Sequence, residues 1–175
     1  MKKYLFIILG IALAIVSCKK NSDDPTSQPI DNWVGSYDGV VDAKGTISSE
    51  PISFISDTLF DRTIDVPMTV RKLSSQRALV TMKYGLVPIP FNAVIDGNTA
   101  SLDDYELVPT IDIPIVVGGI VCNINGIKFS KMILNYDNGV VTGNGKAVVT
   151  AESTLLGGLA KVNLTLDLTP NFTKK

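Results

Sequence analysis

The carboxylates that could act together in chemistry fall into two groups. The first is Asp103, Asp104 and Glu106, and the second is Asp57, Asp61 and Asp65, spaced every four residues. Clustered carboxylates can bind calcium, and a suitably spaced pair can catalyse glycoside hydrolysis. Neither group has the ligand order of a calcium loop, and on a strand Asp104 and Glu106 share the face opposite to Asp103. We therefore predict solvent-exposed structural carboxylates, with no metal site and no catalytic pair.

Histidine is absent from the chain, which removes much of the remaining catalytic chemistry. Ser-His-Asp and Cys-His mechanisms both use an imidazole, and histidine is also the commonest metal ligand. The thiol of Cys122 lies in an apolar stretch between Val121 and Ile124, a setting typical of a buried, unreactive cysteine. We predict a protein that is not an enzyme and that holds no metal or cofactor.

Three apolar segments with turn residues are the remaining candidates for a site. They span residues 84–90, 113–121 and 155–159 and carry few charges. Around the mouth of a barrel they would form an apolar concavity for a ligand or partner, or would face a membrane. Alternatively, they are strand ends packed into the core. The candidate ligand-binding residues are Leu86, Val87, Ile89, Val117, Ile120, Leu155, Leu156 and Leu159.

The charge pattern excludes one class of partner. The net charge is −1, and no run of lysine or arginine interleaves with aromatic residues, so we expect no nucleic acid partner. An arginine inside a barrel could pair with a ligand carboxylate. The only arginines are Arg62, Arg71 and Arg77, and their polar neighbours favour exposed positions.

Alternation of apolar and polar residues predicts the elements that must position these groups. Apolar residues recur at every second position in 66–70, 78–84, 91–95 and, most regularly, 162–168. Hairpin turns are predicted at 96–98 and 136–139, and a change of parity between 120 and 136 predicts a bulge near 130–131. We count eight to ten strands. The best helical candidate, 54–64, is short.

This pattern predicts a single all-β domain over residues 33–175. The architecture is an antiparallel barrel of about eight strands, with a two-sheet β-sandwich as the alternative. Cys18 and Cys122 are the only cysteines. If Cys18 carries lipid, no internal disulfide is possible and core packing alone must hold the domain together.

The N-terminal segment resembles a bacterial lipoprotein signal peptide. Lys2 and Lys3 precede an apolar run from residue 5 to residue 16, which is too short to span a membrane, and Cys18 follows at the lipobox position. The resemblance implies a signal peptide over 1–17, acylation of Cys18, and a polar tether over 18–32. The expected location is the outer membrane of the cell envelope, at its periplasmic face or the cell surface, with the membrane as a partner.

The start of the domain, Trp33-Val34-Gly35-Ser36-Tyr37-Asp38-Gly39, resembles the calycin-like lipoproteins of Gram-negative bacteria. It departs from the lipocalin pattern at Asp31, where lipocalins place a glycine. The resemblance implies an eight-stranded barrel, with Trp33 and Tyr37 plugging one end, that holds a small apolar ligand. The predicted function is non-catalytic binding of a small hydrophobic or amphipathic ligand. The alternative is a structural or protein-interaction module with a filled core and apolar loops that contact a partner.

Overall fold

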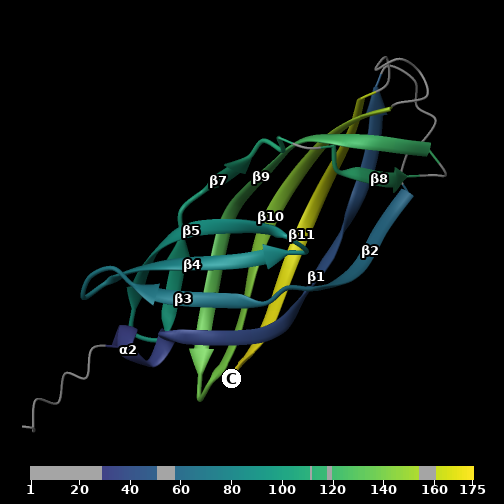
Figure 1. Cartoon of the computed structure of the whole chain (residues 1–175). Coiled ribbons are helices and arrows are strands. Elements are labelled where there is room, and N and C mark those ends of the chain that lie inside the picture. The colour runs from purple at the N-terminus through teal and green to yellow at the C-terminus, as the bar shows by residue number, and fades with distance from the viewer. Residues whose placement is uncertain (1–28, 51–57, 111, 118–119, 154–160) are drawn as a thin grey trace, which may run out of the picture.

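The chain folds into one short helix and eleven strands in the part that the structure describes (Figure 1). The computed structural model describes residues 29–50, 58–110, 112–117, 120–153 and 161–175. The elements are α2 (Pro29–Trp33), β1 (Gly35–Glu50), β2 (Thr58–Asp65), β3 (Met68–Lys72), β4 (Arg77–Tyr84), β5 (Val87–Asp96), β6 (Thr99–Leu102), β7 (Tyr105–Leu107), β8 (Pro114–Val117), β9 (Ile120–Asp137), β10 (Val140–Ser153) and β11 (Lys161–Lys174).

The strands close into an antiparallel barrel. The hydrogen-bonded order is β10-β11-β1-β3-β4-β5-β6-β9, and pairing of β9 with β10 completes a ring of eight strands. Strands β2, β7 and β8 lie outside this ring, β2 beside β1 and the other two beside β9. The prediction of an all-β antiparallel barrel of about eight strands is confirmed. A two-sheet sandwich is excluded because the ring is closed.

Two of the strands outside the ring continue the line of a ring strand. β2 and β3 run one after the other along β1 in a single register, with Val40 opposite Asp65 and Tyr37 opposite Met68. The interruption falls at Pro67, which has no N–H to donate to a ladder. In the same way, β6 and β7 follow one another along β9.

The turns and the bulge follow the sequence pattern. Asp137 pairs with Val140 across a two-residue turn, whose Asn138 and Gly139 have φ of 47° and 87°. Positive φ at both turn positions suits a type I′ hairpin, for which Asn-Gly is the preferred pair. Residue Lys131 has φ of 54°, beside the point where the β9–β10 register shifts. The bulge predicted near 130–131 is therefore confirmed.

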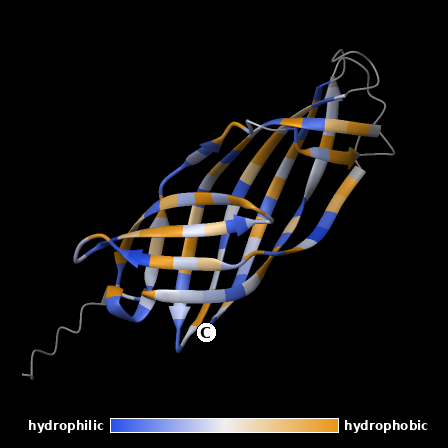
Figure 2. Ribbon diagram, in the orientation of Figure 1, coloured by the Kyte–Doolittle hydropathy of each residue, from blue (hydrophilic) through white to orange (hydrophobic). Residues whose placement is uncertain are grey.

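Buried and exposed side chains alternate along β10 and β11. The ribbon in Figure 2 shows hydrophobic and hydrophilic residues alternating along the strands. In β11 the predicted apolar positions are all buried, namely Val162, Leu164, Leu166 and Leu168. Strand β1 needs glycine where β11 approaches it most closely. A Cβ at Gly39 would meet the backbone of Asn171 and Phe172, and one at Gly45 would meet the carbonyl oxygen of Thr165.

Two local expectations are corrected. The best helical candidate, 54–64, is not helical in its described part, because residues 58–64 belong to strand β2 and pair with β1. Phe60 and Ile64 face the interior at even spacing, a period-two pattern. The second correction concerns the tether predicted over 18–32, because its residues 29–32 form most of α2. Ile30 in this helix is fully buried, so the folded part begins before residue 33.

Helix α2 covers one end of the barrel. Trp33 is 0% exposed and its indole Nε1–H donates to the carbonyl oxygen of Gly97, in the β5–β6 turn, at 3.3 Å. Its ring lies 5.5 Å from the ring of Tyr136, near the end of β9. Tyr37, also fully buried, donates its hydroxyl proton to the Trp33 carbonyl at 2.6 Å. These contacts bury Trp33 and Tyr37 together at the end of the barrel that α2 covers, and we call the two residues the plug.

Candidate functional site

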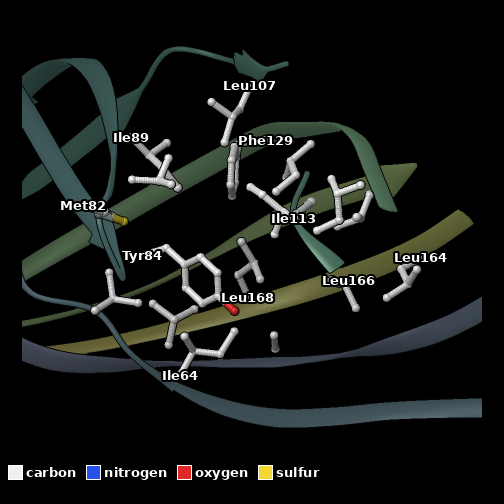
Figure 3. Close-up of a pocket in the computed structure, with 18 of the residues that line it drawn as sticks. Ile64, Met82, Tyr84, Ile89, Leu107, Ile113, Phe129, Leu164, Leu166 and Leu168 are labelled. Carbon is white, nitrogen blue, oxygen red and sulfur yellow. The ribbon is translucent and has the colours of Figure 1, made fainter. Parts of the chain in front are cut away.

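The barrel interior contains an apolar cavity of about 190 Å³ (Figure 3). It occupies the part of the barrel away from α2, because none of the buried side chains beside the plug, such as Met68, Leu134 and Phe172, lines it. A single buried water needs only ~10–15 Å³, so the cavity is far larger than a packing defect. The lining residues are Val41, Ala43, Phe60, Ile64, Val66, Met82, Tyr84, Val87, Ile89, Phe91, Leu107, Ile113, Ile115, Val116, Ile124, Ile127, Phe129, Met132, Ala147, Val149, Leu164, Leu166 and Leu168.

The cavity wall is almost entirely hydrocarbon. Among the described lining residues, the only polar side-chain group besides the methionine sulfurs is the hydroxyl of Tyr84, and none carries a charge. The ring of Phe91 meets the rings of Phe129 and Tyr105 edge-on, at 5.5 and 5.6 Å between centroids. This cluster stiffens one wall. Such walls offer water almost no hydrogen-bond partner and favour apolar molecules.

Unequal strand lengths create the cavity. β4 and β5 meet at the turn between Tyr84 and Val87, whereas β1, β9, β10 and β11 continue well past that turn (Figure 1). Beyond it, β2 pairs only with β1, and β8 only with β9, within the described residues. The β4–β5 turn therefore projects between two sheet edges, and its inward side chains form one side of the cavity.

Exposed apolar residues surround this side of the barrel. Leu86, at the β4–β5 turn, is 89% exposed, and Val116 of β8, which lines the cavity, is 71% exposed. Tyr84 lines the cavity and is 49% exposed, so it lies where the interior meets solvent. Because Tyr84 and Val116 are both exposed and part of the cavity wall, the cavity is open at this point. We call Tyr84, Leu86 and Val116 the rim.

The structure brings together some of the candidate ligand-binding residues. Val87 and Ile89 line the cavity, and Leu86 is on the rim without lining it. Val117 and Ile120 pair with each other at the end of the β8–β9 hairpin, and the positions of their side chains are not described. The remaining candidates, Leu155, Leu156 and Leu159, lie outside the described residues, as does Cys18.

Most of the lining residues were missed as site residues, although the alternation in the sequence predicts burial for several of them. Ile127, Phe129, Leu166 and Leu168 lie on the inner faces of β9 and β11, and the alternation in the sequence identifies that face. Alternation does not distinguish an inner position that packs against another side chain from one that faces a void. The apolar turn 84–90 was the useful signal, since its residues form one side of the cavity.

The described carboxylates of the two acidic groups, Asp61, Asp65, Asp103, Asp104 and Glu106, do not line the cavity. Asp61 forms an ion pair with Lys44 at 3.1 Å, and both side chains are exposed. Asp104 accepts a hydrogen bond from the backbone N–H of Lys131 at 3.3 Å, also at the surface. Among the described residues, no group of three or more acidic or cysteine side chains could hold a metal ion.

Two buried ionisable groups have shifted pKa values. Burial, and secondarily the nearby Tyr136, raises the pKa of the Tyr37 hydroxyl to about 12. Burial also raises the pKa of the Cys122 thiol, and Cys122 is fully inaccessible in the described structure. A high thiol pKa disfavours the thiolate, which is the reactive form. Neither group lines the cavity.

No helix among the described residues is long and apolar enough to span a membrane. The chain matches no protein-family model, and no curated protein is significantly similar to it.

Proposed function

We propose that this protein binds a small hydrophobic or amphipathic molecule inside its barrel, without catalysing a reaction on it. The observation that carries the proposal is the apolar cavity with its opening at the rim. Ligand sites in proteins are typically concave and mostly apolar, with few polar groups. The cavity meets this description.

The energetic cost of the cavity supports a ligand-binding role. Cavity formation in protein cores costs roughly 24 cal/mol per Å³. For the 190 Å³ here, the loss relative to a filled core is at most about 4 to 5 kcal/mol. The total stability of a domain is only about 5–15 kcal/mol, so this is a large fraction. A bound apolar molecule would recover part of it.

The chemistry of the wall supports binding without catalysis. A general acid, base or nucleophile must lie within hydrogen-bonding reach of the reacting group. The described lining residues provide one hydroxyl, that of Tyr84, and no carboxylate, amine or thiol. Hydrocarbon walls can hold a ligand and exclude water from it, but they cannot transfer protons.

A fluorescence titration tests the proposal. The full chain would be held in a non-ionic amphipol and titrated with N-phenylnaphthylamine, whose emission rises in apolar surroundings. Ala147 lines the cavity and is buried, so Ala147→Leu places extra methyl groups in the free space. The neighbouring Val148 is partly exposed and points to the outer face, so Val148→Leu is the matched control.

We expect wild type and Val148→Leu to bind the probe alike and Ala147→Leu to bind at least about tenfold more weakly, because the loss of about 1.4 kcal/mol is tenfold in affinity. Ala43→Leu fills the cavity from β1 and should have the same effect. Circular dichroism would verify that each variant is folded. Equal affinity for all four proteins would contradict binding in the cavity.

The proposal includes an envelope lipoprotein anchored through Cys18. It is supported by the basic residues, apolar run and cysteine at the start of the sequence. Expression in a Gram-negative host with an alkyne-bearing palmitate should label the wild-type chain. Cys18→Ser should abolish the label and release the protein from the membrane fraction. Cys122→Ser, which removes the only other cysteine, should leave the label unchanged.

One observation favours the alternative, a protein-interaction module. The rim residues Leu86 and Val116 are largely exposed, and exposed apolar patches often mark contact sites. Native mass spectrometry of the purified chain would distinguish the two functions. A stoichiometric small molecule on a monomer supports the binding barrel, whereas an oligomer without a small molecule supports the interaction module.

A further inference from the structure

Arg62 is the charged residue of β2 that belongs to the inner face of the barrel. It lies opposite Ala43 in the β1–β2 ladder, and directly opposed residues of an antiparallel pair project to the same face. Ala43 lines the cavity, as do Phe60 and Ile64, the residues two positions before and after Arg62. Each is only ~6.6 Å away along the strand, at ~3.3 Å per residue.

The other two arginines do not share this position. Arg71 follows the buried Val70 in β3, and Arg77 precedes the buried Ala78 in β4, so both project outward. Of the three arginines, only Arg62 therefore occupies an inward-facing position of its strand. The polar neighbours of all three arginines predict exposed positions. Arg62 is exposed as well, but on the cavity side of its strand.

The Arg62 guanidinium has no ion-pair partner among the described residues. The neighbouring carboxylate of Asp61 points to the opposite face and pairs with Lys44. Arg62 lies on an edge strand, at the border of an uncharged cavity. A long arginine stem packs on apolar surface while its charged head stays in water. Such a side chain can hold an anion at the point where the cavity meets solvent.

We propose that Arg62 binds the anionic headgroup of a single-chain amphiphile whose hydrocarbon tail lies in the cavity. The inference rests on the proposed function and specifies its ligand class. Carboxylate and phosphate share the geometry that the five N–H donors of a guanidinium recognise, often with two parallel hydrogen bonds. A fatty acid and an alkyl phosphate are therefore the two sources of the same chemistry.

Arg62 also has a simpler explanation that the experiment must separate from this one. An inward-pointing charge on an edge strand discourages pairing with the edges of other sheets. A residue with only that role would affect aggregation, and it would not distinguish between ligands that differ in headgroup charge. The ratio of affinities for an acid and its neutral ester is therefore the informative quantity.

The experiment measures that ratio by displacement of N-phenylnaphthylamine from the full chain in a non-ionic amphipol. The competitors are palmitate, methyl palmitate and hexadecyl phosphate, which share a chain and differ in headgroup. The variants are Arg62→Ala and, as the matched control, Arg71→Ala. Arg71 lies in β3, which follows β2 along β1 in the same register, so that its removal takes the same charge from the outer face. Sedimentation would record any change in aggregation.

We expect wild type and Arg71→Ala to prefer at least one anion over the ester, and Arg62→Ala to bind that anion about tenfold more weakly, an effect of about 1.4 kcal/mol. Ester affinity should not change, and added salt should reduce the preference in wild type. The favoured anion identifies carboxylate or phosphate as the source. An unchanged acid-to-ester ratio in Arg62→Ala, with or without aggregation, overturns the proposal. Failure of the ester itself to bind overturns the proposed function instead.

Discussion

Ionisation of Tyr37 should destabilise the protein above about pH 10. The hydroxyl is buried beneath α2 and donates its proton to the Trp33 carbonyl, and burial raises its pKa from 10.0 to about 12. The native state therefore keeps the phenol proton over a range of pH in which the unfolded chain has lost it. Stability is complete below about pH 10 and falls as the pH rises toward 12.

The size of the effect follows from the shift. One pKa unit corresponds to about 1.4 kcal/mol, so the two-unit difference is worth at most about 2.7 kcal/mol. At about pH 11, halfway through the interval, the loss is about 1.4 kcal/mol relative to neutral pH. Against a total stability of about 5–15 kcal/mol, such a change is measurable by denaturant unfolding.

Urea unfolding followed by far-ultraviolet circular dichroism, repeated at several values between pH 8 and about pH 11, measures the loss. Lysines titrate in the same range, so the informative comparison is with Tyr37→Phe. That variant should be less stable at neutral pH by about 1 kcal/mol, the net worth of a hydrogen bond. Its further loss at alkaline pH should be smaller than in wild type by about 1.4 kcal/mol. Parallel curves for the two proteins would refute the argument, since they would mean that Tyr37 ionises equally in the native and unfolded states.

Two further predictions concern close packing. Gly45→Ala should lower the free energy of unfolding by about 1–3 kcal/mol, because its Cβ meets the Thr165 carbonyl oxygen on a paired strand. Gly145→Ala should lower the free energy of unfolding by less, because its Cβ meets the flexible thioether of Met132, which borders the cavity and can move into it. Urea unfolding measures both losses, and equal losses would contradict this reasoning. Cys122 should react with iodoacetamide at least about a hundredfold more slowly in the native protein than in urea, since reaction requires a local opening of roughly 3 kcal/mol. Mass spectrometry of the alkylated peptide measures both rates, and rapid native labelling would show that the thiol is accessible.

The fold was predictable because sheet structure leaves a local signature in the sequence. Burial of one face sets a period of two, which identifies Val162 to Leu168 without knowledge of the partner strand. Asn138-Gly139 supports a tight turn through its positive φ values, and the bulge at Lys131 appears as a change of parity. Each of these signals lies within a few residues.

The short helix and strand β2 were not predicted, because tertiary contacts determine both. Helix α2 has five residues, too few to be stable alone, and it forms where Ile30 and Trp33 are buried against the barrel end. Residues 58–65 have a mixed pattern because the inward position between Phe60 and Ile64 holds an arginine. The sequence therefore lacks the apolar alternation that would indicate a strand there.

That interruption in β2 is informative about function. A strand whose inner face were merely packed would place an apolar residue at position 62, since Phe60, Ile64 and Val66 around it all line the cavity. The arginine breaks the pattern on a strand that pairs only with β1 among the described residues, so that the cavity wall here is a sheet edge. Local rules of sequence and structure are expected to fail at functional sites, where chemistry opposes packing. The position where the strand prediction failed is the position at which we place the ligand headgroup.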